Sequence, residues 1–209
     1  MFWVSVGPGE QTPEQFRNSL QIVELPDRLM LEATALYTLT ELMGFRRSAL
    51  ENVSILGDGQ RIPLMSYGLV EYVMALELSQ FEVLELGGGD STEFWSKRVK
   101  TVLTLEQDTD YAKTLKDGAA PNVEVRVLNV AAAAAQIRAL ERTFDIIVID
   151  IAGNRFKCAK AALPLLKPGG FIVLDNSDWY PNTAGVLRDG GLIQIDFHDF
   201  RPRHYERGC

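Results

Sequence analysis

The stretch Val83–Thr92, with the sequence VLELGGGDST, decides the fold of this chain. Its apolar residues predict a buried strand up to Leu86, and the three glycines that follow predict a tight turn. Asp90 and Glu93 have the spacing of a capping box, so we expect a helix to begin at about Ser91. Three successive glycines cost more backbone entropy than a plain turn warrants, and they let a ligand approach the main chain. The stretch therefore predicts a strand, a ligand-binding turn and a helix.

From Phe81 onward, short apolar runs typical of strands alternate with longer runs typical of helices. The strand-like runs are 81–86, 101–106, 123–128, 145–150 and 170–175, and we expect a sixth strand at 191–197. The helical runs between them are 93–100, 109–116, 131–141 and 156–166. This alternation predicts right-handed βαβ units and a parallel sheet. We therefore expect an α/β fold of the Rossmann-like, doubly wound type, with a mostly parallel sheet flanked by helices.

The sequence before this alternation has a different character. From Pro13 to Met43 apolar residues recur at spacings of three, four and seven, which indicates helices. Pro26 and Asp27 offer a helix start, and Gly44 offers a stop. We therefore expect an N-terminal helical appendage over residues 1–64 and the α/β domain over residues 65–209.

Composition and charge exclude several classes of protein. The 209 residues carry a formal net charge of −7, which argues against sequence-independent binding of nucleic acid. No apolar run approaches the roughly 18 residues that a membrane span needs, and Met1–Val4 lacks the cationic start of a signal peptide. Cys158 and Cys209 have no metal-binding spacing, so a reducing compartment is the default. We expect a cytoplasmic protein with a small-molecule substrate and no nucleic-acid or membrane partner.

The ligand of the glycine turn follows from its details. Gly87 and Gly89 fit the dinucleotide fingerprint G-x-G-x-x-G, but Thr92 occupies the third glycine position. Glu106 ends the next strand, 106 − 87 = 19 positions after the first glycine. A carboxylate there can accept hydrogen bonds from two ribose hydroxyls. The pattern supports a nucleoside ligand and gives no support to a pyrophosphate.

Four motifs in order carry a family resemblance: ELGGG at 85–89, Glu106, FDIIVID at 144–150 and LKPGG at 166–170. In these motifs the sequence resembles the class I S-adenosylmethionine-dependent methyltransferases, over roughly residues 65–200. The resemblance implies that residues 65–209 bind S-adenosylmethionine and transfer its methyl group to a small-molecule acceptor, with oxygen favoured as the acceptor atom.

The resemblance also implies the residues of the cofactor site. Glu85 and the backbone of Gly87–Gly89 would hold the methionine end, Glu106 the ribose, and Asn129 the adenine. Asp150 would face the methyl group and the substrate as the catalytic residue. The full cofactor-binding set implied in this way is Glu85, Gly87, Gly88, Gly89, Ser91, Thr92, Glu106, Gln107, Asn129 and Asp150.

Two acidic strand ends also suggest a metal. Asp150 and the pair Asp175-Asn176 follow strands whose carboxyl ends meet at one edge of a parallel sheet. Two carboxylates and an amide oxygen suit Mg²⁺, and the arrangement resembles the metal site of catechol and caffeoyl-coenzyme A O-methyltransferases. The alternative is that these residues cap the strand ends and bind cofactor or substrate directly.

Two other functions stay open at this point. The GGGD sequence also resembles aminopropyltransferases of the spermidine synthase type, although Ser91-Thr92 stands where that family continues with glycine. A non-catalytic nucleoside-binding protein is the other alternative. The chain reaches Cys209 where the seventh strand of a class I methyltransferase would begin, so we expect that strand to be missing or truncated. An open sheet edge would then favour a homo-oligomer.

Overall fold

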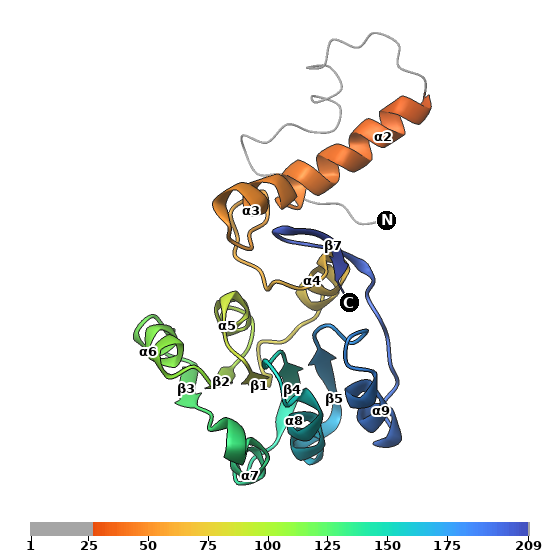
Figure 1. The fold of residues 1–209 in the computed structure, drawn as a ribbon. Coiled ribbons are helices and arrows are strands. Elements are labelled where there is room, and N and C mark those ends of the chain that lie inside the picture. The colour runs from red at the N-terminus through yellow and green to blue at the C-terminus, as the bar shows by residue number, and fades with distance from the viewer. Residues whose placement is uncertain (1–26, 209) are drawn as a thin grey trace.

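The computed structural model describes residues 27–208, so the expected helical pattern before Asp27 and the end of the chain at Cys209 lie outside the described residues. Five parallel strands form one sheet in the order β3-β2-β1-β4-β5 (Figure 1). They are β1 (Glu82–Leu86), β2 (Thr101–Glu106), β3 (Val123–Val127), β4 (Phe144–Ile149) and β5 (Leu166–Leu174). The order reverses between β1 and β4, which is the topological switch point where ligands of open α/β sheets bind.

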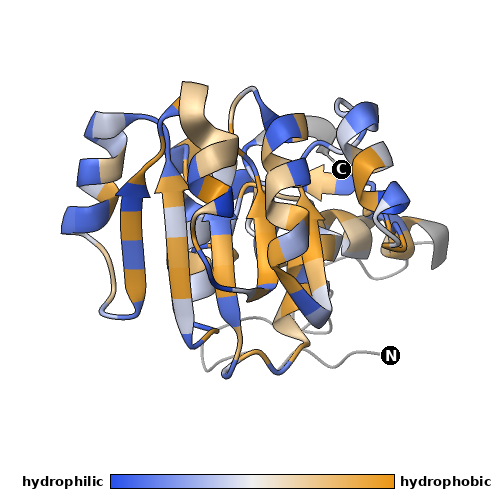
Figure 2. Cartoon of the chain, turned by 90° about the horizontal axis from the view of Figure 1, so that it is seen from below, coloured by the Kyte–Doolittle hydropathy of each residue, from blue (hydrophilic) through white to orange (hydrophobic). Residues whose placement is uncertain are grey.

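Helices follow each strand and cover both faces of the sheet. They are α5 (Asp90–Ser96), α6 (Thr109–Asp117), the 3₁₀ turn η2 (Val130–Ala132), α7 (Ala133–Arg138), α8 (Arg155–Ala162), the 3₁₀ turn η3 (Leu163–Leu165) and α9 (Pro181–Asp189). Figure 2 shows apolar strands running between helices whose polar residues face outward. The Rossmann-like, doubly wound α/β fold is therefore confirmed.

The core consists of two apolar clusters, one on each side of the sheet. In one, strand residues such as Leu84 and Ile147 pack against Ile137 of α7 and Cys158 of α8. In the other, Val83 and Ile146 pack against Phe94 and Trp95 of α5 together with Tyr67 of the helix that precedes the sheet. Side chains on both faces of β1 and β4 are thus buried, which is why these strands read as nearly continuous apolar runs.

The residues before the sheet are helical, as their spacing predicts. They form α2 (Asp27–Tyr37), the π-helical turn η1 (Thr38–Leu42), α3 (Phe45–Glu51) and α4 (Tyr67–Met74). Gly44 lies between η1 and α3 with a φ of 69°, the left-handed conformation in which helices commonly end. Figure 1 shows α2 extending away from the sheet. The last of these helices, α4, packs into the core of the α/β domain. The domain boundary at residue 64 stays a prediction.

The C-terminal part departs from the expectation for 191–197, which is not a strand. The strands found there are β6 (Asp199–Arg201) and β7 (His204–Gly208), an antiparallel hairpin separate from the parallel sheet. Segment 191–197 and β5 together line a cavity of about 460 Å³. A strand forms hydrogen bonds with a neighbouring strand about 4.8 Å away. The cavity separates segment 191–197 from β5, so this segment has no strand to pair with.

Within residues 27–208 the parallel sheet thus ends at β5, with no sixth or seventh strand joined to it. No helix in that same range is long and apolar enough to cross a membrane.

Candidate functional site

The glycine turn joins β1 to α5 at the switch point of the sheet. Gly87 has a φ of 91°, and a Cβ on it would lie 2.9 Å from the backbone oxygen of Asp150. A Cβ on Gly88 would lie 2.6 Å from a methyl group of Leu115. On Gly89 it would meet only the hydroxyl of Tyr111, at 3.7 Å. The first two glycines are therefore required by packing, whereas the third has an open side where a ligand can approach.

Glu85 lies beneath this turn and is fully buried. Its two carboxylate oxygens accept hydrogen bonds from the hydroxyls of Ser91 (2.6 Å), Thr92 (2.6 Å) and Thr104 (2.7 Å). Thr92 Oγ1 in turn accepts a hydrogen bond from the backbone N–H of Gly89 at 3.1 Å. Burial raises the pKa of Glu85 to about 7, because the charged form loses its hydration. This network fixes the turn from inside, and direct contact of Glu85, Ser91 and Thr92 with a cofactor stays a prediction.

Glu106 stands at the end of β2, directly beside the turn. Its Oε2 accepts from the N–H of Gly88 at 2.9 Å, and its Oε1 accepts from the N–H of Asp108 at 2.8 Å. The neighbouring Gln107 has a buried Oε1 with no hydrogen-bond partner. A carboxylate held against the turn and an unused amide oxygen are acceptors for hydroxyl and amino groups, so these residues fit a nucleoside.

Tyr111 is a residue of this site that the sequence analysis missed. It lies in the first turn of α6, and Gly89, Asp90 and Glu106 are close to its hydroxyl. Burial, followed by the charges of those two carboxylates, raises the pKa of Tyr111. An aromatic residue in the first turn of the helix after an acidic strand end was the signal that could have indicated it.

Asn129 has a structural partner of its own. It precedes η2, and its Oδ1 accepts hydrogen bonds from the N–H groups of Ala131 (2.9 Å) and Ala132 (3.3 Å). This is an N-cap, which satisfies backbone donors at the start of a helical turn. The side chain is exposed, and its contact with adenine stays a prediction.

A second polar cluster lies where β4 and β5 end. The structure brings Asp150, Asp175 and Asn176 together, as the parallel sheet predicts, and adds Arg155 between the two carboxylates and Arg201 beside Asn176. Asp175 is 7% exposed, and burial together with the adjacent charge of Asp150 raises its pKa to about 7. Burial also raises the pKa of Asp150, with Arg155 opposing the shift.

The expected Mg²⁺ does not fit this cluster. Arg155 Nη2 donates to Asp150 Oδ1 at 2.7 Å, and Arg155 Nη1 lies 3.8 Å from Asp175 Oδ2. The Asn176 amide, in the orientation that satisfies both of its ends, donates to Asp175 Oδ2 at 2.6 Å and accepts from Arg201 Nη1 at 3.2 Å. The expected ligand oxygens thus face two guanidinium groups, those of Arg155 and Arg201. Among residues 27–208, no group of three or more histidine, cysteine, aspartate or glutamate side chains is placed to hold a metal ion. Arg155 is not among the residues predicted from the sequence, because nothing in the sequence shows that it turns back over the strand ends.

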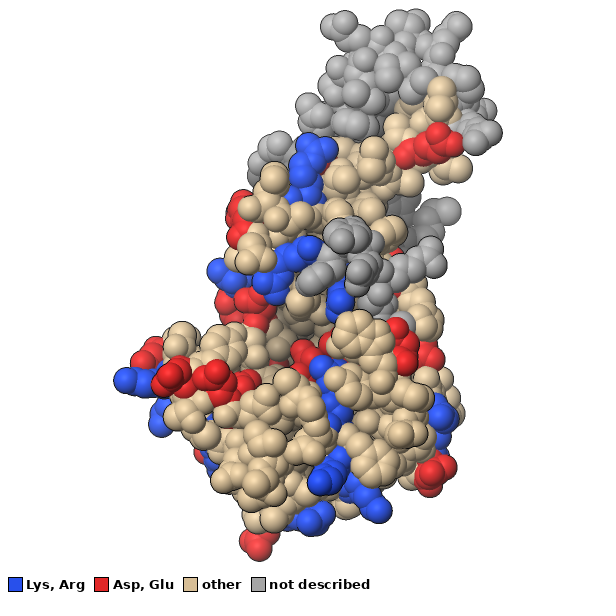
Figure 3. All heavy atoms as spheres, viewed as in Figure 1, with Lys and Arg blue, Asp and Glu red and all other residues tan. Residues whose placement is uncertain are grey.

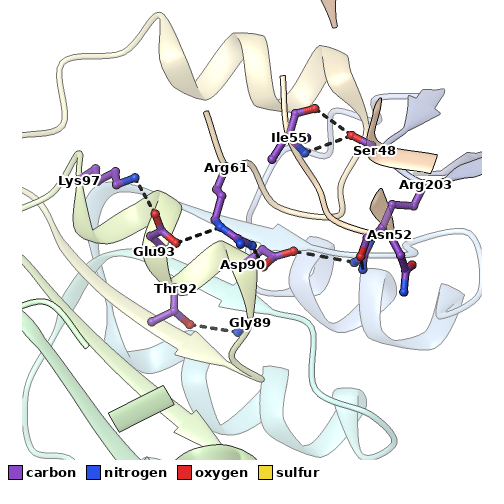
Figure 4. A network of polar contacts seen from close by, with 10 residues as sticks. All are labelled: Ser48, Asn52, Ile55, Arg61, Gly89, Asp90, Thr92, Glu93, Lys97 and Arg203. Carbon is purple, nitrogen blue, oxygen red and sulfur yellow. Dashed lines mark hydrogen bonds and ion pairs between the residues drawn. The ribbon is translucent and has the colours of Figure 1, made fainter. Parts of the chain in front are cut away.

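Charged residues close the other side of the turn (Figure 4). Asp90, at the start of α5, pairs with Arg61 Nη1 at 3.2 Å and lies 3.9 Å from Nη2 of Arg203. Arg203 also donates to the backbone oxygen of Asn52 at 3.1 Å. These contacts join the segment after α3 and the β6–β7 hairpin to the first turn of α5. Figure 3 shows the molecule hollowed between the α/β body and the part above it, with acidic atoms in the hollow.

Comparison with known proteins gives a structural likeness. Neither a protein-family model nor a curated protein matches the chain. Among solved structures it is similar to a precorrin 8W decarboxylase from Methanobacterium thermoautotrophicum, with 19% identity, a TM-score of 0.51, and 63% of this chain and 75% of that chain covered. The chain has the fold of that structure.

Two further solved structures show weaker likeness. One is a precorrin-6y C5,15-methyltransferase from Geobacter metallireducens, which is 20% identical and has a TM-score of 0.48. The match covers 60% of this chain and 70% of that chain. A TehB-like S-adenosylmethionine-dependent methyltransferase from Corynebacterium glutamicum is 17% identical, covers 59% and 73%, and has a TM-score of 0.42. At these identities the likeness concerns the fold alone, so the activity has to be argued from the site.

Proposed function

We propose that this chain is an S-adenosylmethionine-dependent methyltransferase that acts on an oxygen atom of a small-molecule acceptor. The observation that carries the proposal is the placement of Glu106. Its carboxylate is held against the N–H of Gly88, and the unpartnered Oε1 of Gln107 follows it directly in the chain. The family motifs in the sequence and the hollow beside the turn support the same cofactor.

The residues of the cleft divide into two groups. At the turn, Glu106 accepts hydrogen bonds from the ribose hydroxyls, and Gly89 leaves its backbone open to the ligand. The cofactor supplies an electrophilic methyl group on a sulfonium. The carboxylate of Glu106 favours a cationic ligand beside the turn.

Asp150 is the residue placed to take a proton from the acceptor. Its side chain is 36% exposed at the end of β4, whereas Asp175 beside it is buried. The Asp150 carboxylate would accept the proton of the acceptor hydroxyl, and the bound cofactor would supply the methyl group that this oxygen takes up. The positioned base then holds the released proton.

We also propose the class of substrate and the cellular compartment. A net charge of −7 supports a small-molecule substrate rather than a nucleic acid. We propose the cytoplasm as the compartment and no membrane partner, which accords with the sparse cysteines.

Calorimetry with S-adenosylmethionine, its demethylated product, decarboxylated S-adenosylmethionine and NAD tests the cofactor. We expect the first two to bind and Glu106→Gln to weaken their binding by roughly tenfold to a hundredfold, because hydrogen bonds to a charged acceptor contribute about 1.5–3 kcal/mol. Glu93→Gln, a change on the exposed side of α5, is the matched control and should bind like the wild type.

The other outcomes separate the alternatives. Absence of binding for both S-adenosylmethionine and its product would refute the proposal. Tight binding of the decarboxylated form alone would indicate an aminopropyltransferase. Binding without turnover of any hydroxylated acceptor would indicate a nucleoside-binding protein.

A further inference from the structure

The cluster beyond β4 and β5 contains a cation supplied by the chain itself. Arg155 is the first residue of α8, and its side chain is only 6% exposed. Its Nη2 is 2.7 Å from Asp150 Oδ1, and its Nη1 donates to the backbone oxygen of Asp175 and lies 3.8 Å from Asp175 Oδ2. Both carboxylates that the sequence offers as metal ligands therefore contact this guanidinium. The amide oxygen of Asn176 accepts instead from a second buried arginine, Arg201, at 3.2 Å.

The local backbone explains how Arg155 reaches this position. Gly153 and Asn154 both have positive φ values, 66° and 45°, and the chain turns sharply between the end of β4 and the start of α8. Glycine and asparagine are the residues that adopt this left-handed conformation most readily. The turn places Arg155 back over the strand ends, where its Nε donates to the backbone oxygen of Ile151 at 2.9 Å.

Other contacts hold the guanidinium in place. It lies over the ring of Tyr180, 4.6 Å from the ring centroid, which is a cation–π contact. The planar, forked donors of a guanidinium suit several oxygens at once. A divalent ion at the same oxygens would have to displace a buried cation of like sign, at a large electrostatic cost.

We propose that Arg155 takes the position that a divalent cation would occupy in this cleft, so that the carboxylates of Asp150 and Asp175 are held by a guanidinium and the site binds no metal. Arg155 is a positioning residue that fixes the Asp150 carboxylate through the hydrogen bond from Nη2 to Oδ1. This role in methyl transfer rests on the proposed function, whereas the absence of a metal site is a property of the cluster itself.

Titration with Mn²⁺ alone, followed by the paramagnetic resonance signal of the free ion, tests the proposal without cofactor or acceptor. We expect no saturable binding by the wild-type chain. Arg155→Ala uncovers the carboxylates of Asp150 and Asp175, so it should gain one Mn²⁺ site, and the double variant Arg155→Ala, Asp175→Asn should lose that site again. Arg155→Lys keeps a positive charge and should stay free of Mn²⁺.

Two results would overturn the proposal. The first is saturable Mn²⁺ binding by the wild type that disappears in Asp175→Asn, and this result does not depend on whether any Arg155 variant folds. The second is a folded Arg155→Ala chain, verified by circular dichroism, that binds no Mn²⁺. Calorimetry with S-adenosylmethionine on the same wild-type sample reports on the proposed function separately.

Discussion

At the scale of single residues, the most unusual group is Glu85. It is a fully buried carboxyl, and its direct partners are three hydroxyls. Hydroxyls stabilise an ionised carboxylate, but here they do not compensate for the loss of water, so its pKa rises to about 7 from an ordinary 4.5. A group of this kind makes the stability of the fold depend on pH.

The first prediction concerns this dependence. Because the folded state keeps the proton of Glu85 to higher pH than the unfolded state, the stabilisation is complete below pH 4.5 and is lost as the pH rises through about 7. The change across this window is on the order of 3 kcal/mol. Glu85→Gln cannot titrate, so its free energy of unfolding should fall less between pH 5 and pH 8. Urea denaturation of both chains measures the difference, and equal slopes would contradict it.

The second prediction separates two neighbouring glycines. Gly88→Ala places a methyl group against Leu115 and Thr104, so it should destabilise the fold by about 1–3 kcal/mol. Gly89→Ala meets only the hydroxyl of Tyr111, and its extended backbone accepts any residue, so stability should stay within about 0.5 kcal/mol. Because its methyl group projects toward the cleft, Gly89→Ala should still weaken S-adenosylmethionine binding. Denaturation and calorimetry on both variants measure these effects, and a stable Gly88→Ala chain would argue against the packing role.

At the scale of elements, two kinds of contact hold the segments that precede the sheet, one within these segments and one to the α/β body. Ser48 of α3 is fully buried, and its hydroxyl both donates to the backbone oxygen of Ile55 (2.8 Å) and accepts from its N–H (3.1 Å). Arg61 instead reaches Asp90 and Glu93 of α5 from a side chain that is 43% exposed. Figure 4 shows the Arg61 contacts at the first turn of α5 and the Ser48–Ile55 hydrogen bonds apart from them.

The third prediction is that these two contacts differ in strength. Ser48→Ala leaves a buried N–H and a buried carbonyl without their partner, so it should cost about 1–3 kcal/mol. Arg61→Ala removes exposed ion pairs, which contribute up to about 1 kcal/mol in water. Thermal denaturation of the two variants under one set of conditions provides the comparison. A larger loss for Arg61→Ala would show that burial does not decide the strength of these contacts.

At the scale of the whole molecule, the two edges of the sheet differ. The edge strand β3 carries the exposed charges of Glu124 and Arg126, which discourage pairing with another chain. Along β5 lies the apolar cavity of about 460 Å³, and across it Ile193 and Ile195 are 91% and 71% exposed. We therefore propose that self-association takes place at the β5 edge rather than at the β3 edge.

The fourth prediction is that the chain forms a homo-oligomer through this edge. Light scattering after size-exclusion chromatography should give more than the mass of one chain. Ile195→Lys should shift the protein toward the monomer, because a charge beside the open edge opposes pairing. Val127→Lys, on the opposite edge, is the control and should leave the mass unchanged. A wild-type chain that remains monomeric at high concentration would contradict the prediction.

The sequence by itself determined the parallel sheet, the glycine turn and the acidic residue at the end of β2. Each depends on a local pattern, since apolar runs mark buried strands and successive glycines mark a tight turn. The convergence of Asp150 and Asp175 also followed, because parallel strands end at a common edge.

Only the tertiary structure decided which side chains meet across that edge. It brought Arg155 onto the carboxylates, placed Tyr111 beside the turn and joined Arg203 to Asp90, and it left 191–197 without a strand partner. Periodicity indicates which face of an element is buried, but a contact between distant residues depends on how the elements pack. For that reason a cleft that the sequence suggests for a metal contains an arginine.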